Sequence, residues 1–238
     1  MAMKEGIMKK GIITAVVAVL FLGLSGIAFA GDPTSIVQTS KTHFPIVISA
    51  PGSYQLNSNL VVSEPGTTAI LVEANDVTID LNGYSILGPA VCTGCPASCT
   101  LTGLGVGIDA LTFGVDNLRV SNGVVSGMGA EGIAAFNNAV IENVRAIGNG
   151  ADGIDVYYLS DGLFSNYFTV RDCISNFNGH DGIDTGVSGL VVENVTDCNG
   201  NDGLNLDANV GYGHNVSVGN GNINCYLGTP FDSTNYCP

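Results

Sequence analysis

Short aliphatic runs separated by polar turns recur along most of this chain. Examples are VTIDL at 77–81, VIENV at 140–144 and LVVENV at 190–195. Valine and isoleucine alternate with polar residues in these runs, which is typical of β-strands with one buried side. Glycine, asparagine and aspartate bound the runs, and these residues favour tight turns. The pattern therefore predicts an all-β protein built from short strands.

The runs return at a nearly constant spacing. A glycine followed by an aliphatic residue recurs at intervals of 25, 21, 29 and 21 residues, at Gly107, Gly132, Gly153, Gly182 and Gly203. A period in the low twenties is typical of a solenoid, in which each unit buries its apolar side against the next. The Leu/Asn consensus of leucine-rich repeats is absent. We expect coils whose strands join into parallel sheets about 4.8 Å apart.

On these repeats, and on the opening segment ISAPGSYQLNSNLVV at 48–62, the chain resembles the right-handed parallel β-helix superfamily. That superfamily includes pectate lyases, polygalacturonases, alginate lyases and uronate epimerases, and the resemblance covers roughly 67–222. It implies a right-handed parallel β-helix of six or seven coils with capped ends. It also implies that catalytic acids stand on an outer sheet face. The DPHE motif of the epimerases and the catalytic motifs of the lyases and polygalacturonases are missing, so no active-site residue is carried over from these enzymes.

The N-terminus has the pattern of a signal peptide. A basic MKK at 8–10 precedes an apolar run at 11–27 and the small-residue sequence AFA at 28–30. We expect cleavage after residue 30; an uncleaved leader that spans the membrane is the alternative. The remainder divides into an N-terminal cap with the first coil at 31–66, a β-helix at 67–222 with insertions at about 88–103 and 157–168, and a C-terminal cap at 223–238. The protein is predicted to be secreted, periplasmic or on the cell surface, with no membrane attachment after cleavage.

The exported part is strongly acidic. Residues 1–30 carry three lysines and one glutamate, so the net charge of −14 for the whole chain becomes −16 without them. The fixed positive charges that remain are Lys41, Arg119, Arg145 and Arg171. Nucleic-acid binding needs a basic surface and is excluded as a function class. Such acidity suits divalent cations, or serves solubility alone.

All seven cysteines lie in the exported part, where an oxidising compartment favours disulfides. We expect Cys225 and Cys237 to fasten the C-terminal end, and Cys173 and Cys198 to bridge neighbouring coils. The odd cysteine is then expected among those at 92, 95 and 99. A metal cluster formed by these three is the alternative, although no histidine lies near them in the sequence.

The phrase Asn-Gly-x-Asp-Gly occurs at 149–153, 178–182 and 199–203. Its aspartates, Asp152, Asp181 and Asp202, precede strands, and Glu131 holds the equivalent place one coil earlier. These carboxylates can accept hydrogen bonds from turn N–H groups. Because the repeat would stack them coil upon coil, they are also candidate ligands for a hard oxygen-binding ion such as Ca²⁺.

A second aspartate follows in two copies of the phrase. Ile154 and Ile183 are expected to face the core, so Asp155 and Asp184 should face outward from the same sheet. Asp109 is the equivalent residue further along the stack, while Ala134 and Asn205 interrupt the row. We predict that Asp155 and Asp184 form an acid/base pair acting on a sugar chain, with His180 as a general base. The alternatives are a solvated outer face and an ordinary turn histidine.

The insertion at 157–168 leaves the stack directly after this pair. It holds five of the seventeen phenylalanines and tyrosines of the chain, including Tyr157, Tyr158 and Tyr167. These tyrosines could stack on pyranose rings, or the loop could pack on itself as compact Ω-loops do. Arg145 and Arg171 are the mid-chain cations that could neutralise a uronate carboxylate, or they could pair with nearby acids.

Two functional hypotheses follow. In the first, the protein is a secreted β-helix that interacts with extracellular polysaccharide, with Ca²⁺-assisted action on acidic glycans. In the second, it is a non-catalytic structural or adhesive surface module that assembles through its ends into oligomers.

Overall fold

The computed structural model describes residues 31–100, 102–157, 165–230 and 234–238. Residues from Asp32 to Pro238 form one compact unit, and the predicted signal peptide lies outside the described residues. The described residues form strands, turns and loops without a helix, which confirms the all-β prediction. Accordingly, no membrane-spanning helix is found among them.

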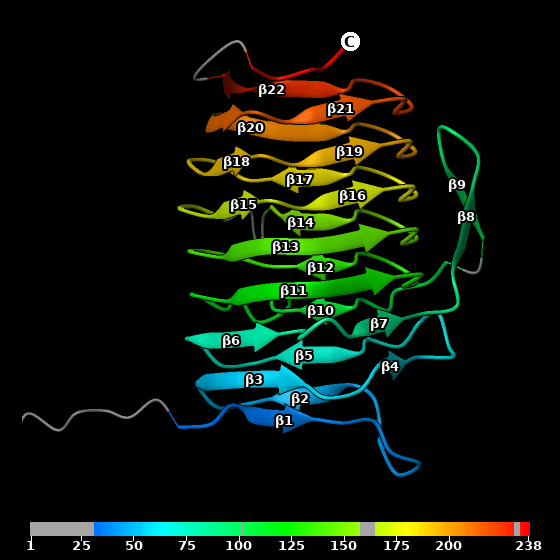
Figure 1. Cartoon of the computed structure of the whole chain (residues 1–238), viewed down its shortest axis with the longest axis vertical. Coiled ribbons are helices and arrows are strands. Elements are labelled where there is room, and N and C mark those ends of the chain that lie inside the picture. The colour runs from blue at the N-terminus through cyan, green and yellow to red at the C-terminus, as the bar shows by residue number, and fades with distance from the viewer. Residues whose placement is uncertain (1–30, 101, 158–164, 231–233) are drawn as a thin grey trace, which may run out of the picture. The chain divides into compact units, whose positions relative to one another are not determined.

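The strands stack into three parallel sheets that form the sides of each coil (Figure 1). Sheet 1 contains β2 (Ile46–Ile48), β5 (Ile70–Val72), β10 (Ile108–Asp109), β12 (Ile133–Ala134), β14 (Ile154–Val156), β17 (Ile183–Thr185) and the first parts of β20 (Leu204–Gly213) and β22 (Cys225–Pro230). Sheet 2 contains β1 (Thr34–Ile36), β3 (Gly52–Leu56), β6 (Val77–Asp80), the first parts of β11 (Arg119–Ser126) and β13 (Val140–Ile147), β15 (Thr169–Arg171), β18 (Leu190–Val192) and the last part of β20. Sheet 3 contains β4 (Leu60–Val61), β7 (Ser85–Leu87), the second parts of β11 and β13, β16 (Ile174–Asn176), β19 (Val195–Asp197) and β21 (Val216–Val218).

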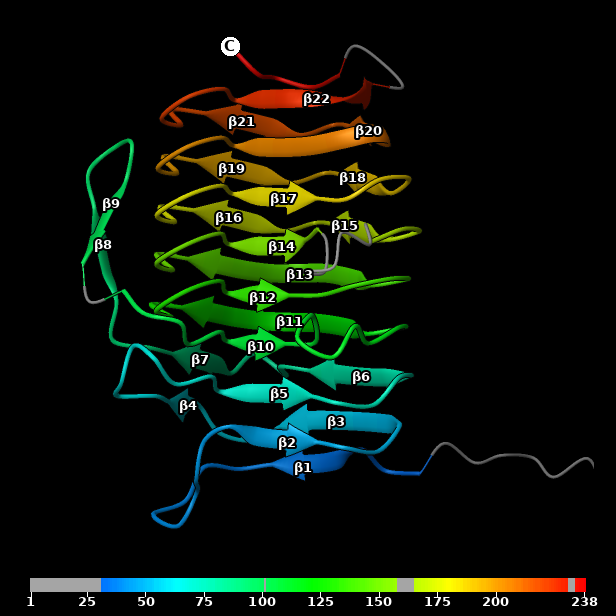
Figure 2. The same cartoon turned by 180° about the vertical axis from the view of Figure 1, so that it is seen from behind.

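The three sheets are continuous, because β11, β13 and β20 each run through a corner and pair in two of them. Together they form one 20-stranded sheet whose named pairings are all parallel. Seen from both sides, each coil lies directly on the one before it (Figures 1 and 2). The long parallel sheet is consistent with a β-helix-like solenoid. Because a parallel pairing cannot be closed by a tight hairpin, each strand requires the full circuit of a coil before its partner.

Aliphatic side chains stack in register through the core. In sheet 1, Ile70, Ile108, Ile133, Ile154 and Ile183 pair successively and are fully buried. Each contributes roughly 1.5–3 kcal/mol through burial. The alternation of apolar and polar positions in the sequence thus corresponds to inward and outward directions in every strand.

The asparagines of the repeated phrase form a buried ladder at the corner between sheets 3 and 1. Asn149 donates from its backbone N and Nδ2 to Oδ1 of Asn178, both at 3.0 Å, and Asn178 donates in the same way to Asn199. Asn199 then donates to Asn220. Because each amide satisfies a buried backbone N–H of the preceding coil, the ladder holds neighbouring coils at a fixed register.

The glycine of the same Asn-Gly pair is required by close approach. A Cβ added to Gly179 would lie 2.3 Å from the carbonyl oxygen of Gly150, and one added to Gly200 would lie 2.2 Å from that of Gly179. Turn glycines are often required for a positive φ angle. The positive φ instead belongs to the residue before the asparagine, as at Gly148, Phe177 and Cys198.

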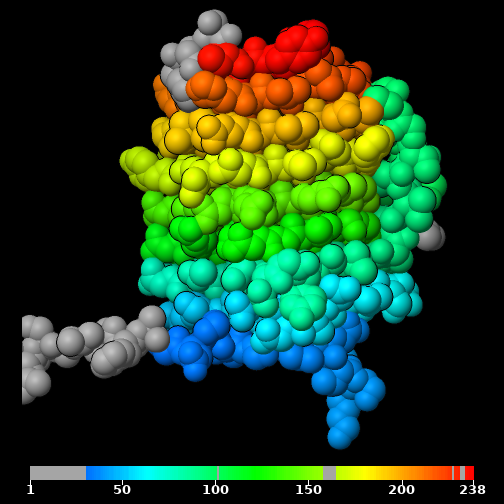
Figure 3. Space-filling view, in the orientation of Figure 1, coloured from blue at the N-terminus to red at the C-terminus, as the bar shows by residue number. Residues whose placement is uncertain are grey.

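The first insertion forms an antiparallel hairpin of β8 (Val91–Thr93) and β9 (Ser98–Thr100). It lies along the edge of the stacked coils (Figure 3). A disulfide joins Cys92 to Cys99 across the hairpin, and another joins Cys95 to Cys198, 103 residues further along the chain. The hairpin therefore fastens several coils together from outside.

The predicted bridge between Cys173 and Cys198 is wrong. Cys173 faces the core, is 1% exposed and is the free cysteine of the described residues, whereas Cys198 turns outward to Cys95 at a corner. The two sulfurs thus lie on opposite sides of the coil wall. The odd cysteine is accordingly not in the group at 92, 95 and 99. Burial raises the pKa of the Cys173 thiol to about 12, so this thiol is unreactive.

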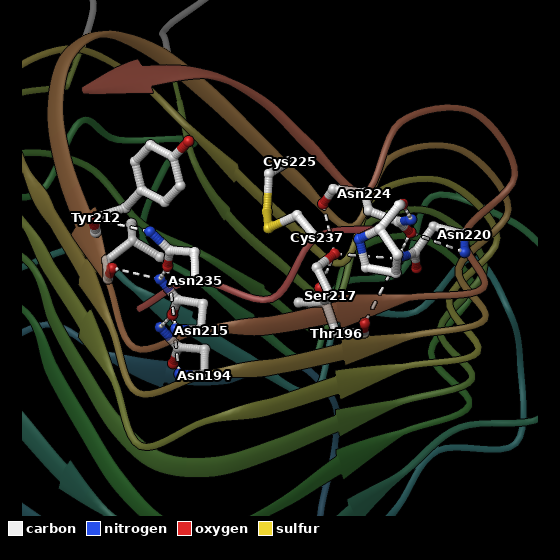
Figure 4. Close-up of a disulfide and its surroundings, with 12 residues drawn as sticks. Asn194, Thr196, Tyr212, Asn215, Ser217, Asn220, Asn224, Cys225, Asn235 and Cys237 are labelled. Carbon is white, nitrogen blue, oxygen red and sulfur yellow. Dashed lines mark hydrogen bonds between the residues drawn. A yellow bond between two sulfur atoms is a disulfide. The ribbon is translucent and has the colours of Figure 1, made fainter. Parts of the chain in front are cut away.

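The C-terminal tail closes one end of the stack (Figure 4). The expected disulfide between Cys225 and Cys237 draws it back over the last coil. Asn235 receives hydrogen bonds from the N and Nδ2 of Asn215, which continues a second asparagine ladder from Asn194. The three disulfides of the structure indicate an oxidising, extracytoplasmic environment.

Candidate functional site

An outward-facing row on sheet 1 carries the predicted acid pair. Asp155 of β14 pairs in register with Asp184 of β17, while the buried Ile154 and Ile183 beside them face the core. The row continues in register from Asp109 through Ala134 on one side, and through Asn205 to Tyr226 on the other. The predicted interruptions at Ala134 and Asn205 are confirmed.

The turn aspartates form a second, inner row beside this one. Oδ1 of Asp152 accepts a hydrogen bond from the backbone N of Asp181 at 2.6 Å, and Oδ1 of Asp181 accepts one from the N of Asp202 at 2.7 Å. Asp202 in turn accepts from the N of Ile223 at 2.8 Å. The donors belong to the next coil rather than to the aspartate's own turn. These carboxylates accept backbone hydrogen bonds, as the sequence predicted, but they connect neighbouring coils and do not close their own turns.

Asp109 has a local role. Its Oδ1 accepts from the backbone N–H groups of Leu111 and Thr112, and its Oδ2 accepts from the Thr112 hydroxyl at 2.6 Å. This arrangement is an Asx-type turn that starts the loop after β10. Asp109 thus has its oxygens satisfied, unlike the two aspartates further along the row.

His180 lies between two of the turn aspartates. Its Nδ1 is 2.8 Å from Oδ1 of Asp152 and 3.4 Å from Oδ2 of Asp181. The hydrogen bond to Asp152 and the nearby negative charges outweigh partial burial and raise the pKa of His180 to about 9. The imidazole is consequently protonated at neutral pH. In this form it carries a positive charge and can donate a proton, and a role as general base would require its deprotonation.

Four carboxyl groups of the site have raised pKa values. Burial is the main cause for Asp155, whose pKa lies well above its ordinary value, and the charges of Asp152, Asp184 and Glu131 add to it. Burial, together with the charges of Asp152 and Asp181, raises the pKa of Asp184 to about 8. The pKa values of Glu131 and Asp181 are also raised, again chiefly by burial. Burial therefore disfavours the ionised form of each of these four carboxyl groups.

Two oxygens of this row are not satisfied. The backbone at Tyr157 and at Thr185 lowers the pKa of Asp155 and Asp184 respectively, against the larger effect of burial. Within the described part of the chain, Oδ1 of each aspartate is nevertheless buried without a hydrogen-bond partner. A buried acceptor without a hydrogen-bond partner destabilises the folded state. Binding of a ligand or a proton to the oxygen would remove this penalty.

Glu131, Asp152 and Asp155 offer three oxygens that all lie within 4.8 Å of one another, and Asp152, His180 and Asp181 form a second such group. These buried acidic clusters can bind a metal ion, and their carboxylate oxygens suit a hard cation. A third group, Cys95, Asp197 and Cys198, cannot supply thiolates because its two cysteines are joined in a disulfide.

The aromatic residues of the second insertion that the structure describes differ in their exposure. Tyr158 lies outside the described residues. Tyr157 directly follows β14 and is two residues after Asp155. Tyr167 is 75% exposed at the turn before β15. Phe168 fills the core instead and packs against the Cα of Gly189.

The two arginines lie on other faces. Arg171 is on sheet 2, where it pairs with Glu142 and lies 3.6 Å from Asp172. Arg145 is on sheet 3, next to Ile174 in the register. The structure thus separates both arginines from the acids of sheet 1, because the chain turns a corner between them. Sequence spacing alone could not assign them to a sheet.

Tyr226 was not found by the sequence analysis. It stands two coils beyond Asp184 in the same outward row and is 41% exposed. Its own segment, NCYLGTP, lacks the repeated phrase, which left no signal for its register.

Comparison with protein-family models, curated proteins and solved structures finds no match for this chain. The candidate site is therefore defined by the geometry of sheet 1. A row of carboxyl groups with raised pKa values, two unsatisfied oxygens and an adjacent imidazolium can exchange protons and bind a cation.

Proposed function

We propose that the protein is a secreted parallel β-helix that binds a divalent cation, of the Ca²⁺ type, on the outer face of sheet 1. Through this ion it holds an acidic polysaccharide outside the cell. The supporting observation is the cluster of Glu131, Asp152 and Asp155, whose oxygens lie within 4.8 Å of one another beside the unsatisfied Oδ1 of Asp155.

The electrostatics support a cation at this place. In their ionised forms, the four carboxyl groups with raised pKa values repel neighbouring acids, and His180 supplies a single compensating charge. A divalent ion lowers these pKa values and displaces protons. When bound, it supplies positive charge to a face that would otherwise repel a polyuronate.

The proposal extends to acid–base catalysis on the bound glycan. A pKa of about 8 leaves Asp184 able to give or take a proton near neutral pH. Asp155, one coil away in register, provides the second carboxyl group. Release of new chain ends from polyuronates, lost in Asp184→Asn, would establish the enzymatic form.

Calorimetric titration of the Asp32–Pro238 unit with Ca²⁺, after removal of metal with EDTA, tests the cation site. We expect one saturable site with a Kd on the order of 10⁻⁴ to 10⁻³ M, as in extracellular calcium modules. Affinity should rise between pH 7 and pH 9 as Asp184, whose pKa is raised to about 8, loses its proton. The Asp155→Asn/Asp184→Asn variant should lose binding.

The matched control is Glu64→Gln/Glu193→Gln, which removes the same charge from two exposed positions. It should bind as the original protein does. An equal loss of Ca²⁺ binding in both double variants would show that binding depends only on the overall charge. The absence of saturable binding in the original protein would refute the cation site.

A second candidate function is self-assembly through the N-terminal end of the stack. Among the described strands, β1 and β2 are each paired on one edge, with β3 and β5. Val37, Val47 and Val61 near this end are 46%, 49% and 52% exposed. An open apolar edge favours pairing with another copy. Sedimentation velocity over a concentration series should then show association that Val47→Lys abolishes, and a strict monomer would refute it.

A further inference from the structure

A groove lies at the corner between sheets 2 and 3, away from the acids of sheet 1. It measures about 310 Å³ and is lined by Gly83, Asn122, Gly123, Val124, Asn143 and Arg145. At this corner β11 and β13 each turn through one outward residue with positive φ, Asn122 at 63° and Asn143 at 51°. The groove therefore presents two stacked amides beside one guanidinium.

The three arginines of the exported chain differ in their partners. Arg119 and Arg171 both pair with Glu142. Arg145 is exposed and forms no ion pair with any part of the chain that the structure describes. Its neighbours in register are Val124 and Ile174, whose side chains offer no acceptor. An exposed arginine that forms no ion pair with the described acids is available to an external anion.

The amides beside Arg145 have a defined direction. Nδ2 of Asn143 donates to Oδ1 of Asn122 at 3.0 Å, and Nδ2 of Asn122 donates to Oδ1 of Asp80 at 3.1 Å. Asp80 also accepts hydrogen bonds from the backbone N of Asn82 and from Nε2 of Gln55. Burial raises the pKa of Asp80, but these hydrogen bonds outweigh it and keep its carboxylate ionised. Among the described residues, no hydrogen bond to Oδ1 of Asn143 is found, so this oxygen remains available as an acceptor at the groove.

We infer that this groove binds a hydroxylated carboxylate, of which a uronic acid residue is the natural example. The carboxylate pairs with the planar fork of Arg145, which suits two parallel hydrogen bonds. A ligand hydroxyl donates to Oδ1 of Asn143. The negative charge of Asp80 behind the amides disfavours dianions and selects a singly charged group. This site is independent of the cation site on sheet 1.

The test is a nuclear magnetic resonance titration of the ¹⁵N-labelled Asp32–Pro238 unit with sodium D-glucuronate. Sodium acetate and D-glucose are parallel probes, and EDTA is present so that the cation site cannot contribute. We expect saturable shifts confined to residues 122–124 and 143–145, with a Kd on the order of 1 mM. Acetate should bind more weakly, and glucose should not bind.

Arg145→Gln should weaken glucuronate binding by about tenfold or more, because a charge-assisted pair is lost. Asn143→Gly keeps a residue that tolerates the positive φ and removes the acceptor, so glucuronate should then bind only as well as acetate. Lys41→Gln removes an exposed cation elsewhere and should change nothing. Unchanged binding in Arg145→Gln, equal weakening in Lys41→Gln, or no saturable binding in the original protein would each overturn the inference.

Discussion

The asparagine ladder and the outward acid row arise from the same repeated phrase, yet they have opposite energetic character. Asn149, Asn178 and Asn199 are fully buried, and each amide both donates to and accepts from its neighbours. Asp155 and Asp184 also stack in register, but each retains a buried oxygen with no partner in the described residues. The asparagine row stabilises the coil stack, whereas the acid row lowers the stability of the stack.

The difference follows from the chemistry of the two side chains. A carboxamide has a donor and an acceptor, so a column of amides satisfies itself. Ionised carboxylates only accept hydrogen bonds and repel each other at the spacing of the coils, about 4.8 Å. A polar row that closes its own hydrogen bonds is therefore structural, and one that cannot do so is a candidate for binding or proton exchange.

The largest expected effect is at the ladder. Asn178→Ala removes donors to Asn199, the Ala146 carbonyl and the Ser175 hydroxyl, and leaves the backbone N–H of Asn149 buried without its acceptor. We expect the free energy of unfolding to fall by about 3 kcal/mol. Urea unfolding measures the change, with Asn222→Ala at an exposed position as the control. A loss below that of the control would show that the ladder does not stabilise the stack.

A smaller loss is expected where the coils approach most closely. The Cβ of Gly179→Ala would meet the Gly150 carbonyl oxygen, whereas Gly66→Ala places its Cβ in open space. We expect the first to lower the free energy of unfolding by about 2 kcal/mol and the second to leave it nearly unchanged. Equal values in urea unfolding would show that the coil spacing adjusts without strain.

In the acid row, by contrast, a substitution should raise the free energy of unfolding. Because the folded-state pKa of Asp184 is raised to about 8, the stability associated with its protonated form is complete below pH 4 and is lost as pH rises to about 8. Asp184→Asn should therefore stabilise the protein at pH 9, by an amount on the order of 1 kcal/mol, and change little at pH 4. Destabilisation at pH 9 would mean that the carboxylate is satisfied by a partner.

The smallest effect is expected at His180, whose side chain is 55% exposed. Its folded-state pKa is raised to about 9, so its contribution is fully present below pH 6.5 and is lost as pH rises through 9. His180→Gln should lower the melting temperature slightly at pH 6 and have no effect at pH 10. A difference that persists at pH 10 would assign His180 a packing role instead of a charge.

Much of the fold could be predicted because the periodicity reports a local property. The alternation around Ile154 and Ile183 established which residues face the core, and it placed Asp155 and Asp184 outside together. The expected row from Asp109 to Asn205, including its interruptions, has the register found in the structure. These positions follow from counting residues in a repeating strand, and such counting does not require knowledge of the whole coil.

Other features depend on how the coils close in three dimensions. The pairing of Cys95 with Cys198 requires a hairpin that reaches along the stack, and the free Cys173 depends on which side of the wall it faces. The separation of Arg145 from the acids depends on a corner between sheets. Insertions break the count of residues, and a disulfide or an ion pair depends on distance through space. The repeat therefore specified the coil and its inward face, while the tertiary arrangement decided which outward residues meet.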